Sequence, residues 1–218
     1  MSNSVAVVPS KRVQNPESSI RNIVFDLGGV LIDWNPRYLY RQLGGDEEQI
    51  EWFLTHVCHS EWNEQQDAGR TFAEAIADRL AHFPEHEAWI RAYYDRWQDM
   101  LGGPIDGTVE ILSELKENGR PLFALTNWSA ESFPVAREMY PFLNWFDGIV
   151  VSGELKMIKP DPKIYLHLLE VHNIRAEESV FIDDRLPNVE GARAVGFTGI
   201  QFHSPEQLRA ELEHLGVL

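Results

Sequence analysis

Carboxylate side chains stand directly after two of the short apolar runs in this sequence. Asp26 follows the run Ile23–Phe25, and the pair Asp183 and Asp184 follows Val180–Ile182. If both runs are strands of one parallel sheet, these side chains meet at its carboxyl edge, where open α/β sheets bind their ligands. Three carboxylates crowded together repel one another unless a cation compensates, and hard oxygen ligands suit Mg²⁺. The pattern therefore predicts a magnesium site at this edge.

A hydroxyl group and an amine belong to the same predicted edge. Thr126 and Asn127 follow the run Leu122–Leu125, and Lys159 stands just before a helical pattern. Taken singly, each of these residues has a structural explanation, as a helix cap, a strand residue or a surface charge. Taken together with the carboxylates, Thr126 and Lys159 are suited to hold the oxygens of an anionic group. The chain has no cluster of histidine and cysteine with zinc spacing, which disfavours a transition-metal site.

The elements that must position these residues are short strands alternating with helices. Most of the strand candidates are continuous apolar runs, as expected for strands buried on both faces of a parallel sheet. Between them lie helical patterns with clear ends, such as Asp161 followed by Pro162. This alternation predicts an α/β fold, a Rossmann-like doubly wound parallel sheet. The five predicted strands are Ile23–Phe25, Leu122–Leu125, Ile149–Val151, Val180–Ile182 and Thr198–Phe202.

The interval between the first two strands reads as helix without a strand. It predicts a helical cap domain over residues 35–104, inserted after the first strand, with the core domain formed by 21–34 and 105–218. Residues 1–20 are polar and mixed, and we expect a flexible N-terminal tail. The expected helices are Arg37–Leu43, Glu47–His56, Thr71–Ala81 and Glu85–Met100.

Aromatic residues are frequent in the predicted cap. Four of the seven tryptophans lie there, and we expect them to fill a separate small core. These tryptophans are Trp52, Trp62, Trp89 and Trp97.

Composition restricts the classes of partner. A formal net charge of −15 and a pI near 4.9 argue against binding to nucleic acid and against docking on an anionic membrane. No segment approaches the length of a transmembrane helix. The single cysteine, Cys58, excludes an internal disulfide and is expected to be a small buried side chain. We therefore expect a cytoplasmic protein, a monomer or a dimer.

The four polar strand ends resemble the four motifs of the haloacid dehalogenase (HAD) superfamily, subfamily I with a helical cap. Phe25–Val30 resembles motif I, Leu125–Asn127 motif II, Lys159–Tyr165 motif III, and Phe181–Asn188 motif IV in its Asp-Asp-x-x-x-Asn form. The motifs occur in the family's order, and the likeness extends over nearly all of residues 22–202. The resemblance therefore implies a HAD hydrolase.

The resemblance implies roles for the residues that would meet the substrate. Asp26 would be the nucleophile that forms an aspartyl phosphate. Thr126, Asn127 and Lys159 would hold the phosphoryl oxygens, with Thr126 and Lys159 counted as catalytic. Trp128, beside motif II, is expected to line the substrate pocket.

The resemblance also implies a Mg²⁺ site. Asp26, the Gly28 carbonyl and Asp183 would bind the ion, with Asp184 as a further ligand and Asn188 in a supporting position. The ion would neutralise charge that otherwise repels the incoming phosphate.

Gly28 departs from the family pattern. Most phosphatases of the family have a second aspartate there, which protonates the leaving oxygen and then activates water. Glycine leaves the general acid unassigned, and the Asp-x-Gly form resembles the bacterial glucose-1-phosphate phosphatase group. Asp33, His56 and His59 are candidate substitutes, and the predicted loop 61–70 could approach the substrate.

The site residues and the family resemblance together predict a Mg²⁺-dependent hydrolase that cleaves small, sugar-phosphate-like phosphomonoesters. A metal-independent 2-haloacid dehalogenase is the first alternative, because those enzymes also lack the second aspartate of motif I. The retained pair Asp183 and Asp184 counts against it, because two carboxylates without a cation are poorly suited to bind an anionic halocarboxylate. A weakly catalytic HAD scaffold that binds a phosphorylated ligand or a protein partner is the second alternative.

Overall fold

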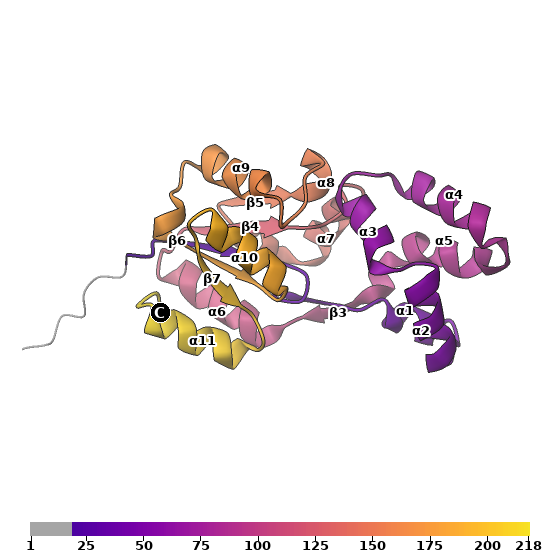
Figure 1. The fold of residues 1–218 in the computed structure, drawn as a ribbon. Coiled ribbons are helices and arrows are strands. Elements are labelled where there is room, and N and C mark those ends of the chain that lie inside the picture. Colours follow the sequence, from indigo (N-terminus) through magenta and orange to yellow (C-terminus); the bar gives the residue numbers. More distant parts are fainter. Residues whose placement is uncertain (1–18) are drawn as a thin grey trace, which may run out of the picture.

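Residues 19–218 of this computed structural model are described; they form an α/β core from which a helical cap extends (Figure 1). The core contains a five-stranded sheet in the order β5-β4-β1-β6-β7. Every pair of neighbouring strands in it is parallel. All five predicted strands are therefore confirmed, and they are β1 (Asn22–Phe25), β4 (Leu122–Thr126), β5 (Gly148–Val151), β6 (Ser179–Asp183) and β7 (Thr198–Gln201).

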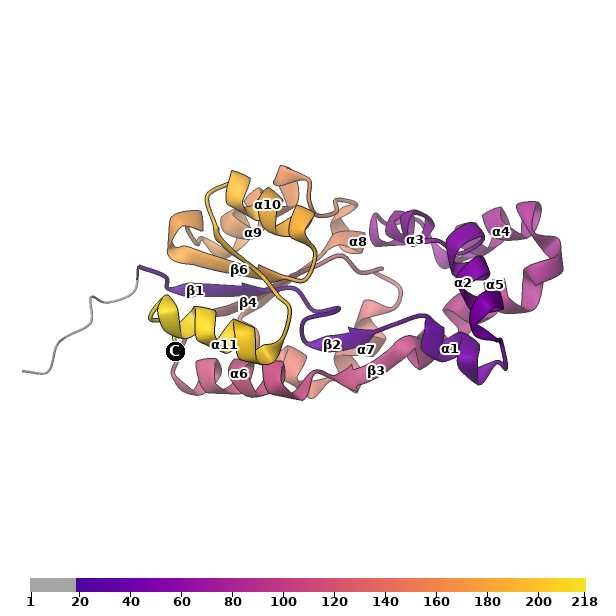
Figure 2. The ribbon, with the colours of Figure 1, turned by 60° about the horizontal axis from the view of Figure 1, so that its bottom comes forward.

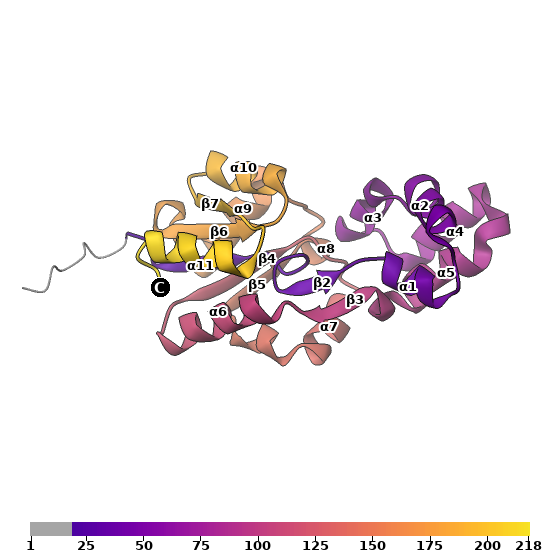
Figure 3. The same cartoon turned by 90° about the horizontal axis from the view of Figure 1, so that it is seen from below.

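Helices cover both faces of the sheet, as the doubly wound fold requires (Figure 3). Alternate side chains of β1 explain this: Ile23 and Phe25 point into one apolar core and Val24 into the other. The first core is completed by α6 (Asp106–Glu117), α7 (Phe133–Met139) and α11 (Pro205–His214). The second core is completed by α9 (Pro162–His172) and α10 (Leu186–Ala194).

Helix ends in the core follow from local sequence. The Asp161 side chain accepts a hydrogen bond from the Lys163 backbone and caps α9, with Pro162 in the first turn, as predicted. Ser204 caps α11 in the same way by accepting from the Gln207 backbone. A short helix, α8 (Ser152–Leu155), follows β5 at the carboxyl edge of the sheet.

A two-stranded antiparallel ribbon links the core to the cap (Figure 2). It consists of β2 (Ile32–Trp34) and β3 (Leu101–Pro104), and neither strand was predicted. Both strands are too short to show an apolar period, and β3 carries two glycines, which are poor strand formers.

The cap is a set of helices with a hydrophobic core of its own. Trp62 and Cys58 are buried in it, and Trp89 packs against it, as expected. Two other expectations are wrong. The Trp52 side chain is 44% exposed and stacks on His56, and Trp97 packs against the core domain instead. The cap helices are α1 (Arg37–Gln42), α2 (Glu47–His56), α3 (Ser60–Asp67), α4 (Phe72–His82) and α5 (Glu87–Asp95).

Helix α3 lies where a loop was predicted, so that interpretation is wrong. Its sequence is almost entirely polar, so it has no apolar stripe to reveal a helix. The helix forms because His59 caps its first turn and because Trp62 and Gln66, one turn apart, share its buried face. Its exposed and half-buried face is left free to meet the core domain.

Short 3₁₀ helices and the chain start complete the description. Residues 1–18 of the predicted tail lie outside the described residues, but Ile20, also assigned to the tail, is buried against the core. None of the helices in residues 19–218 combines the length and hydropathy of a membrane span. The 3₁₀ helices are Pro84–His86, Trp97–Met100, Pro141–Trp145 and Ala176–Glu178.

Candidate active site

Asp26 extends from the carboxyl end of β1 and is 7% exposed. Its Oδ1 atom accepts a hydrogen bond of 2.7 Å from the Leu27 backbone N–H and lies 2.9 Å from the Lys159 ammonium. Within residues 19–218, no hydrogen bond or ion pair engages the other oxygen, Oδ2. The carboxylate is thus held by one oxygen while the second stays available for chemistry.

Lys159 lies beneath this carboxylate and is almost fully buried. Its Nζ donates to Asp183 Oδ2 at 2.7 Å and to the Leu125 carbonyl at 2.8 Å, and it pairs with Asp26. Burial by itself would lower the pKa of Lys159, but the charges of Asp26 and Asp183 outweigh burial and raise this pKa. The ammonium is therefore charged at neutral pH and links the two carboxylates.

Burial also changes the pKa of Asp26, and it raises this pKa because it disfavours the charged carboxylate. It raises the pKa of Asp26 to about 7, against the lowering effect of Lys159 and with a further rise from the charge of Asp183. A buried carboxylate with a second carboxylate beside it holds its proton more tightly. Any bound cation would oppose this effect and favour the ionised form.

Asp26, Asp183 and Asp184 form the predicted carboxylate cluster. One ligand oxygen from each lies within 4.8 Å of the others. Asp183 is fully buried, and it is oriented by the Asn188 side chain, at 3.0 and 3.1 Å, and by the Arg185 backbone N–H. Three carboxylates against one lysine leave an excess of negative charge, and this donor set fits a hard divalent cation such as Mg²⁺.

Gly28 and Gly29, which follow Asp26 closely, differ in the space around the position of a Cβ atom. Gly29 has a positive φ of 75°, and a Cβ placed there would lie 2.7 Å from Asp184 Oδ2. A side chain at Gly29 would therefore displace the third carboxylate. Gly28 has nothing within 4 Å of such a Cβ, so no neighbouring atom blocks the start of a side chain there.

The motif II residues lie at the end of β4, next to the cluster. Thr126 is buried there, while Asn127 and Trp128 line the adjoining pocket. The Asn127 side chain exchanges two hydrogen bonds with the Lys159 backbone and so fixes the motif III segment. Trp128 Nε1 donates to Ser132, which fixes the indole ring in the pocket wall.

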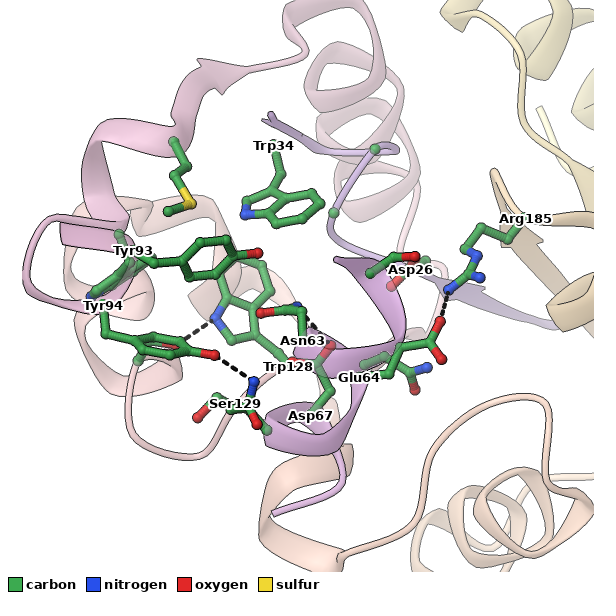
Figure 4. A pocket seen from close by; sticks show the side chains of 18 of the residues that line it. Asp26, Trp34, Asn63, Glu64, Asp67, Tyr93, Tyr94, Trp128, Ser129 and Arg185 are labelled. Carbon is green, nitrogen blue, oxygen red and sulfur yellow. Dashed lines mark hydrogen bonds and ion pairs between the residues drawn. The ribbon is translucent and has the colours of Figure 1, made fainter. Parts of the chain in front are cut away.

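A pocket of about 250 Å³ lies between the carboxylate cluster and the cap (Figure 4). Its core side is polar and includes Asp26, Asp184 and Asn188. Its other walls are rich in aromatic rings. Of these rings, only Trp128 was predicted from the sequence to line the pocket. These rings belong to Trp34, Phe72, Tyr93, Tyr94, Trp97 and Trp128.

Helix α3 supplies the polar part of the cap wall. Asn63, Glu64 and Asp67 line the pocket, and Asn63 Nδ2 lies 3.4 Å from Asp67 Oδ2 (Figure 4). Burial raises the pKa of Asp67 to about 7, with smaller contributions from the charges of Glu64 and Asp26. The expectation that this segment approaches the substrate site fits the structure, although a helix carries it.

Contacts from α3 and from the start of α4 hold the cap against the core. The Ser152 hydroxyl donates to the Asp67 carbonyl at 2.6 Å, and the Phe72 backbone N–H donates to Glu131 at 2.7 Å. Glu64 pairs with Arg185 at 2.9 Å across the pocket edge (Figure 4). The pocket is therefore enclosed by residues distant in sequence.

The three substitutes proposed for the missing acid do not line this pocket. Asp33 lies in β2, where the Tyr38 hydroxyl donates to it. His56 is exposed and contacts the Trp52 carbonyl, and His59 caps α3. Each of the three side chains is thus engaged outside the residues that line the pocket.

The Glu64–Arg185 pair makes a testable contribution to stability. Because the side chains are 31% and 54% exposed, Arg185→Ala should lower the free energy of unfolding by no more than about 1 kcal/mol. Urea titration measures this change, with Arg175→Ala, which breaks an exposed pair remote from the pocket, as the control. A loss several times larger would show that the pair is a main support of the closed cap.

Comparison with known proteins agrees with this geometry. A family model described as haloacid dehalogenase-like hydrolase matches residues 20–196. A sesquiterpene phosphatase of Aspergillus oryzae is 31% identical over 201 residues, which cover 91% of this chain and 97% of the relative. A phosphoglycolate phosphatase of Thiobacillus denitrificans is 28% identical, covering 81% of this chain and 80% of the relative.

A solved structure shares the fold. A HAD family enzyme from Bacteroides thetaiotaomicron, in complex with magnesium and inorganic phosphate, superposes with a TM-score of 0.64 at 22% identity, over 85% of this chain and 95% of the other. The family match covers most of the sequence and includes all four polar strand ends. This chain therefore belongs to the haloacid dehalogenase-like hydrolase family.

Proposed function

We propose that this protein is a Mg²⁺-dependent phosphatase that hydrolyses phosphomonoesters of small uncharged alcohols through an aspartyl phosphate on Asp26. The main support is the carboxylate of Asp26, held through Oδ1 by Lys159 and the Leu27 backbone with Oδ2 free, beside a pocket. Oδ2 attacks phosphorus, the bond to the ester oxygen breaks, and the alcohol leaves with a proton. Water then cleaves the acyl phosphate, which regenerates Asp26 and releases inorganic phosphate.

The remaining predicted residues have separate tasks. Lys159 offsets the charge of the carboxylates as the phosphate dianion enters, and Thr126 and the Asn127 backbone are assigned to the phosphoryl oxygens. Asn127 acts also through its side chain, because it fixes the Lys159 backbone. Trp128 forms part of the wall against the organic group.

The residues proposed to hold Mg²⁺ are Asp26, Asp183 and Asp184, with the Gly28 carbonyl as a further predicted ligand. Asn188 orients Asp183 and is not itself a proposed ligand. When bound, the ion would screen the charge of the transferred phosphoryl group. The magnesium in the Bacteroides thetaiotaomicron enzyme supports this assignment by analogy of fold.

The pocket walls favour an uncharged organic group on the substrate. Arg185 is the cationic side chain among the lining residues of the described chain, and Glu64 already pairs with it. A second anionic group would therefore lie against aromatic rings without a free partner, at a high desolvation cost. Sugar-like and more apolar alcohols fit this wall better than the carboxylate of phosphoglycolate.

The dehalogenase alternative is less well supported. Attack on carbon in a 2-haloacid needs no metal, yet Asp183 and Asp184 add negative charge where an anionic halocarboxylate would bind. A binding scaffold without catalysis is also less well supported, because Asp26 and Lys159 are both present and in contact.

A substrate panel with and without chelator tests the proposal. We expect phosphate release from glucose-1-phosphate and from phosphate monoesters of uncharged alkyl alcohols with Mg²⁺. Release should fall by about 10²-fold or more with EDTA, since several kcal/mol of charge stabilisation is lost. Phosphoglycolate should be a poorer substrate. Halide release from 2-chloropropionate that EDTA does not affect would overturn the phosphatase assignment.

A further inference from the structure

The glycine at position 28 leaves the reaction without its usual proton donor. The ester oxygen leaves as an alkoxide unless an acid protonates it, and for an alkyl ester such an acid contributes about 10²- to 10⁴-fold. In-line displacement places the leaving oxygen opposite the attacking oxygen of Asp26. Asp26 lies on the core side of the pocket, so the leaving oxygen faces the cap wall (Figure 4). We therefore expect the acid that replaces the missing aspartate to lie on the cap.

Few pocket residues are chemically able to donate this proton. No histidine lines the pocket within residues 19–218, and burial raises the pKa values of the Tyr93 and Tyr94 hydroxyls far above neutrality. The remaining carboxyl groups of the cap wall are Glu64 and Asp67. Glu64 already pairs with Arg185 at 2.9 Å, so its carboxylate is not free to contact a leaving oxygen.

Asp67 differs from Glu64 in having no cationic partner. No ion pair of the described residues includes it, and its side-chain hydrogen bond comes from the neutral Asn63 amide at 3.4 Å. The charged groups around it are Glu64 and Asp26, which favour its protonated form, and Arg185 and Lys159, which oppose it. Burial is the largest influence, and it does not depend on any ion at the carboxylate cluster.

The backbone of Asp67 is also fixed relative to the core. The Ser152 hydroxyl, at the start of α8, donates to its carbonyl oxygen at 2.6 Å. Through this bond the last turn of α3 is attached to the core domain that carries Asp26. A catalytic acid needs such positioning, because proton transfer requires hydrogen-bond distance to the leaving oxygen.

We infer that Asp67 of the cap is the general acid that protonates the leaving oxygen, in place of the aspartate that Gly28 lacks. The inference rests on the proposed phosphatase function. When the P–O bond breaks, the electron pair stays on the ester oxygen and the Asp67 proton moves to it, which releases a neutral alcohol. In the second step the Asp67 carboxylate takes a proton from the water that attacks the aspartyl phosphate, and the acid is restored.

Asp67→Asn tests this role with two esters of different leaving ability. Asparagine keeps the shape and can keep the contact with Asn63, but its amide has no acidic proton to transfer. For hexyl phosphate we expect kcat/KM to fall by about 10²-fold, because its alkoxide needs protonation to leave. For 4-nitrophenyl phosphate the change in kcat/KM should stay within about threefold, because its phenolate leaves without an acid. Glu61→Gln, an exposed change on the same helix, is the matched control and should alter neither ester.

Two further measurements separate catalysis from structural support. In the wild type, kcat/KM for hexyl phosphate relative to 4-nitrophenyl phosphate should fall as pH rises through about 7, the pKa of Asp67, and Asp67→Asn should abolish that fall. Adding Gly28→Asp to Asp67→Asn should restore hydrolysis of the hexyl ester preferentially, because the aspartate would supply an acid at position 28, where a Cβ meets no atom within 4 Å.

An equal loss for both esters in Asp67→Asn would overturn the inference and assign Asp67 a structural role. Failure of the proposed function itself would be visible separately, as no phosphate release from either ester by the wild type, and it would overturn both.

Discussion

Asp26→Asn should abolish turnover while leaving the fold intact. The amide has the same shape but cannot attack phosphorus, and loss of a nucleophile typically lowers kcat by about 10⁴- to 10⁶-fold. The variant should not be less stable than the wild type near neutral pH, because burial already raises the pKa of Asp26 to about 7 and penalises its charge in the folded state. Phosphate release at saturating substrate, together with circular dichroism, measures both effects.

Covalent trapping gives this prediction a sharper form. Acid quenching during turnover should yield wild-type protein heavier by one phosphoryl group, with the modified peptide containing Asp26, and no such species in Asp26→Asn. Asp106→Asn, an exposed change at the start of α6, is the control and should keep full activity. Phosphate release by Asp26→Asn at more than a hundredth of the wild-type rate, with no adduct in either protein, would contradict the aspartyl-phosphate mechanism.

Lys159→Met should destabilise the protein as well as inactivate it. The buried ammonium compensates Asp26 at 2.9 Å and Asp183 at 2.7 Å, and its removal leaves two neighbouring carboxylates without their cationic partner. Removing one member of a buried ion pair costs about 3–5 kcal/mol, and we expect a loss of that order in EDTA at pH 8. Mg²⁺ should restore part of it, because the ion would supply the missing positive charge.

The pH dependence of this loss has a definite sign. Without Lys159, burial and mutual repulsion hold the pKa of Asp26 in the folded state still further above its value in the unfolded chain. A carboxyl group whose folded pKa is raised destabilises the fold increasingly as pH rises from the unfolded to the folded pKa. The difference from wild type should therefore be smaller at pH 5 than at pH 8.

Urea unfolding at the two pH values, in EDTA and in Mg²⁺, measures these effects. Lys163→Met, at an exposed position in α9, is the matched control and should change the free energy of unfolding by no more than about 0.5 kcal/mol. A Lys159→Met variant as stable as the wild type in EDTA at pH 8 would show that the two carboxylates share a proton or are hydrated.

The polar strand ends could be predicted because the information is local. Each strand of the sheet is a short apolar run, and the residue after it lies at the carboxyl edge whatever the rest of the chain does. Asp26 and Asp183 were found in this way, and the structure brings them into contact with Lys159. The HAD motifs added the assignment of roles, which strand ends alone do not give.

The cap could be predicted only in outline. Its apolar helices were visible as periodic patterns, but α3 is polar and has no such pattern, so the element that carries Asn63, Glu64 and Asp67 appeared as a loop. Its helical state depends on burying Trp62 and Gln66 in the cap core. Contacts of this kind are made after the surrounding helices have packed.

The sequence by itself determined the sheet, its carboxyl edge and the residues on that edge, because the strand period and the strand ends depend on neighbouring residues. The tertiary structure alone decided what faces that edge. Asp67 meets the core through Ser152, 85 residues away, and Glu64 meets Arg185, 121 residues away. Residues so far apart in the sequence meet only because the cap packs on the core. The side chains that face Asp26 across the pocket are therefore determined by the docking of the two domains and by no local sequence pattern.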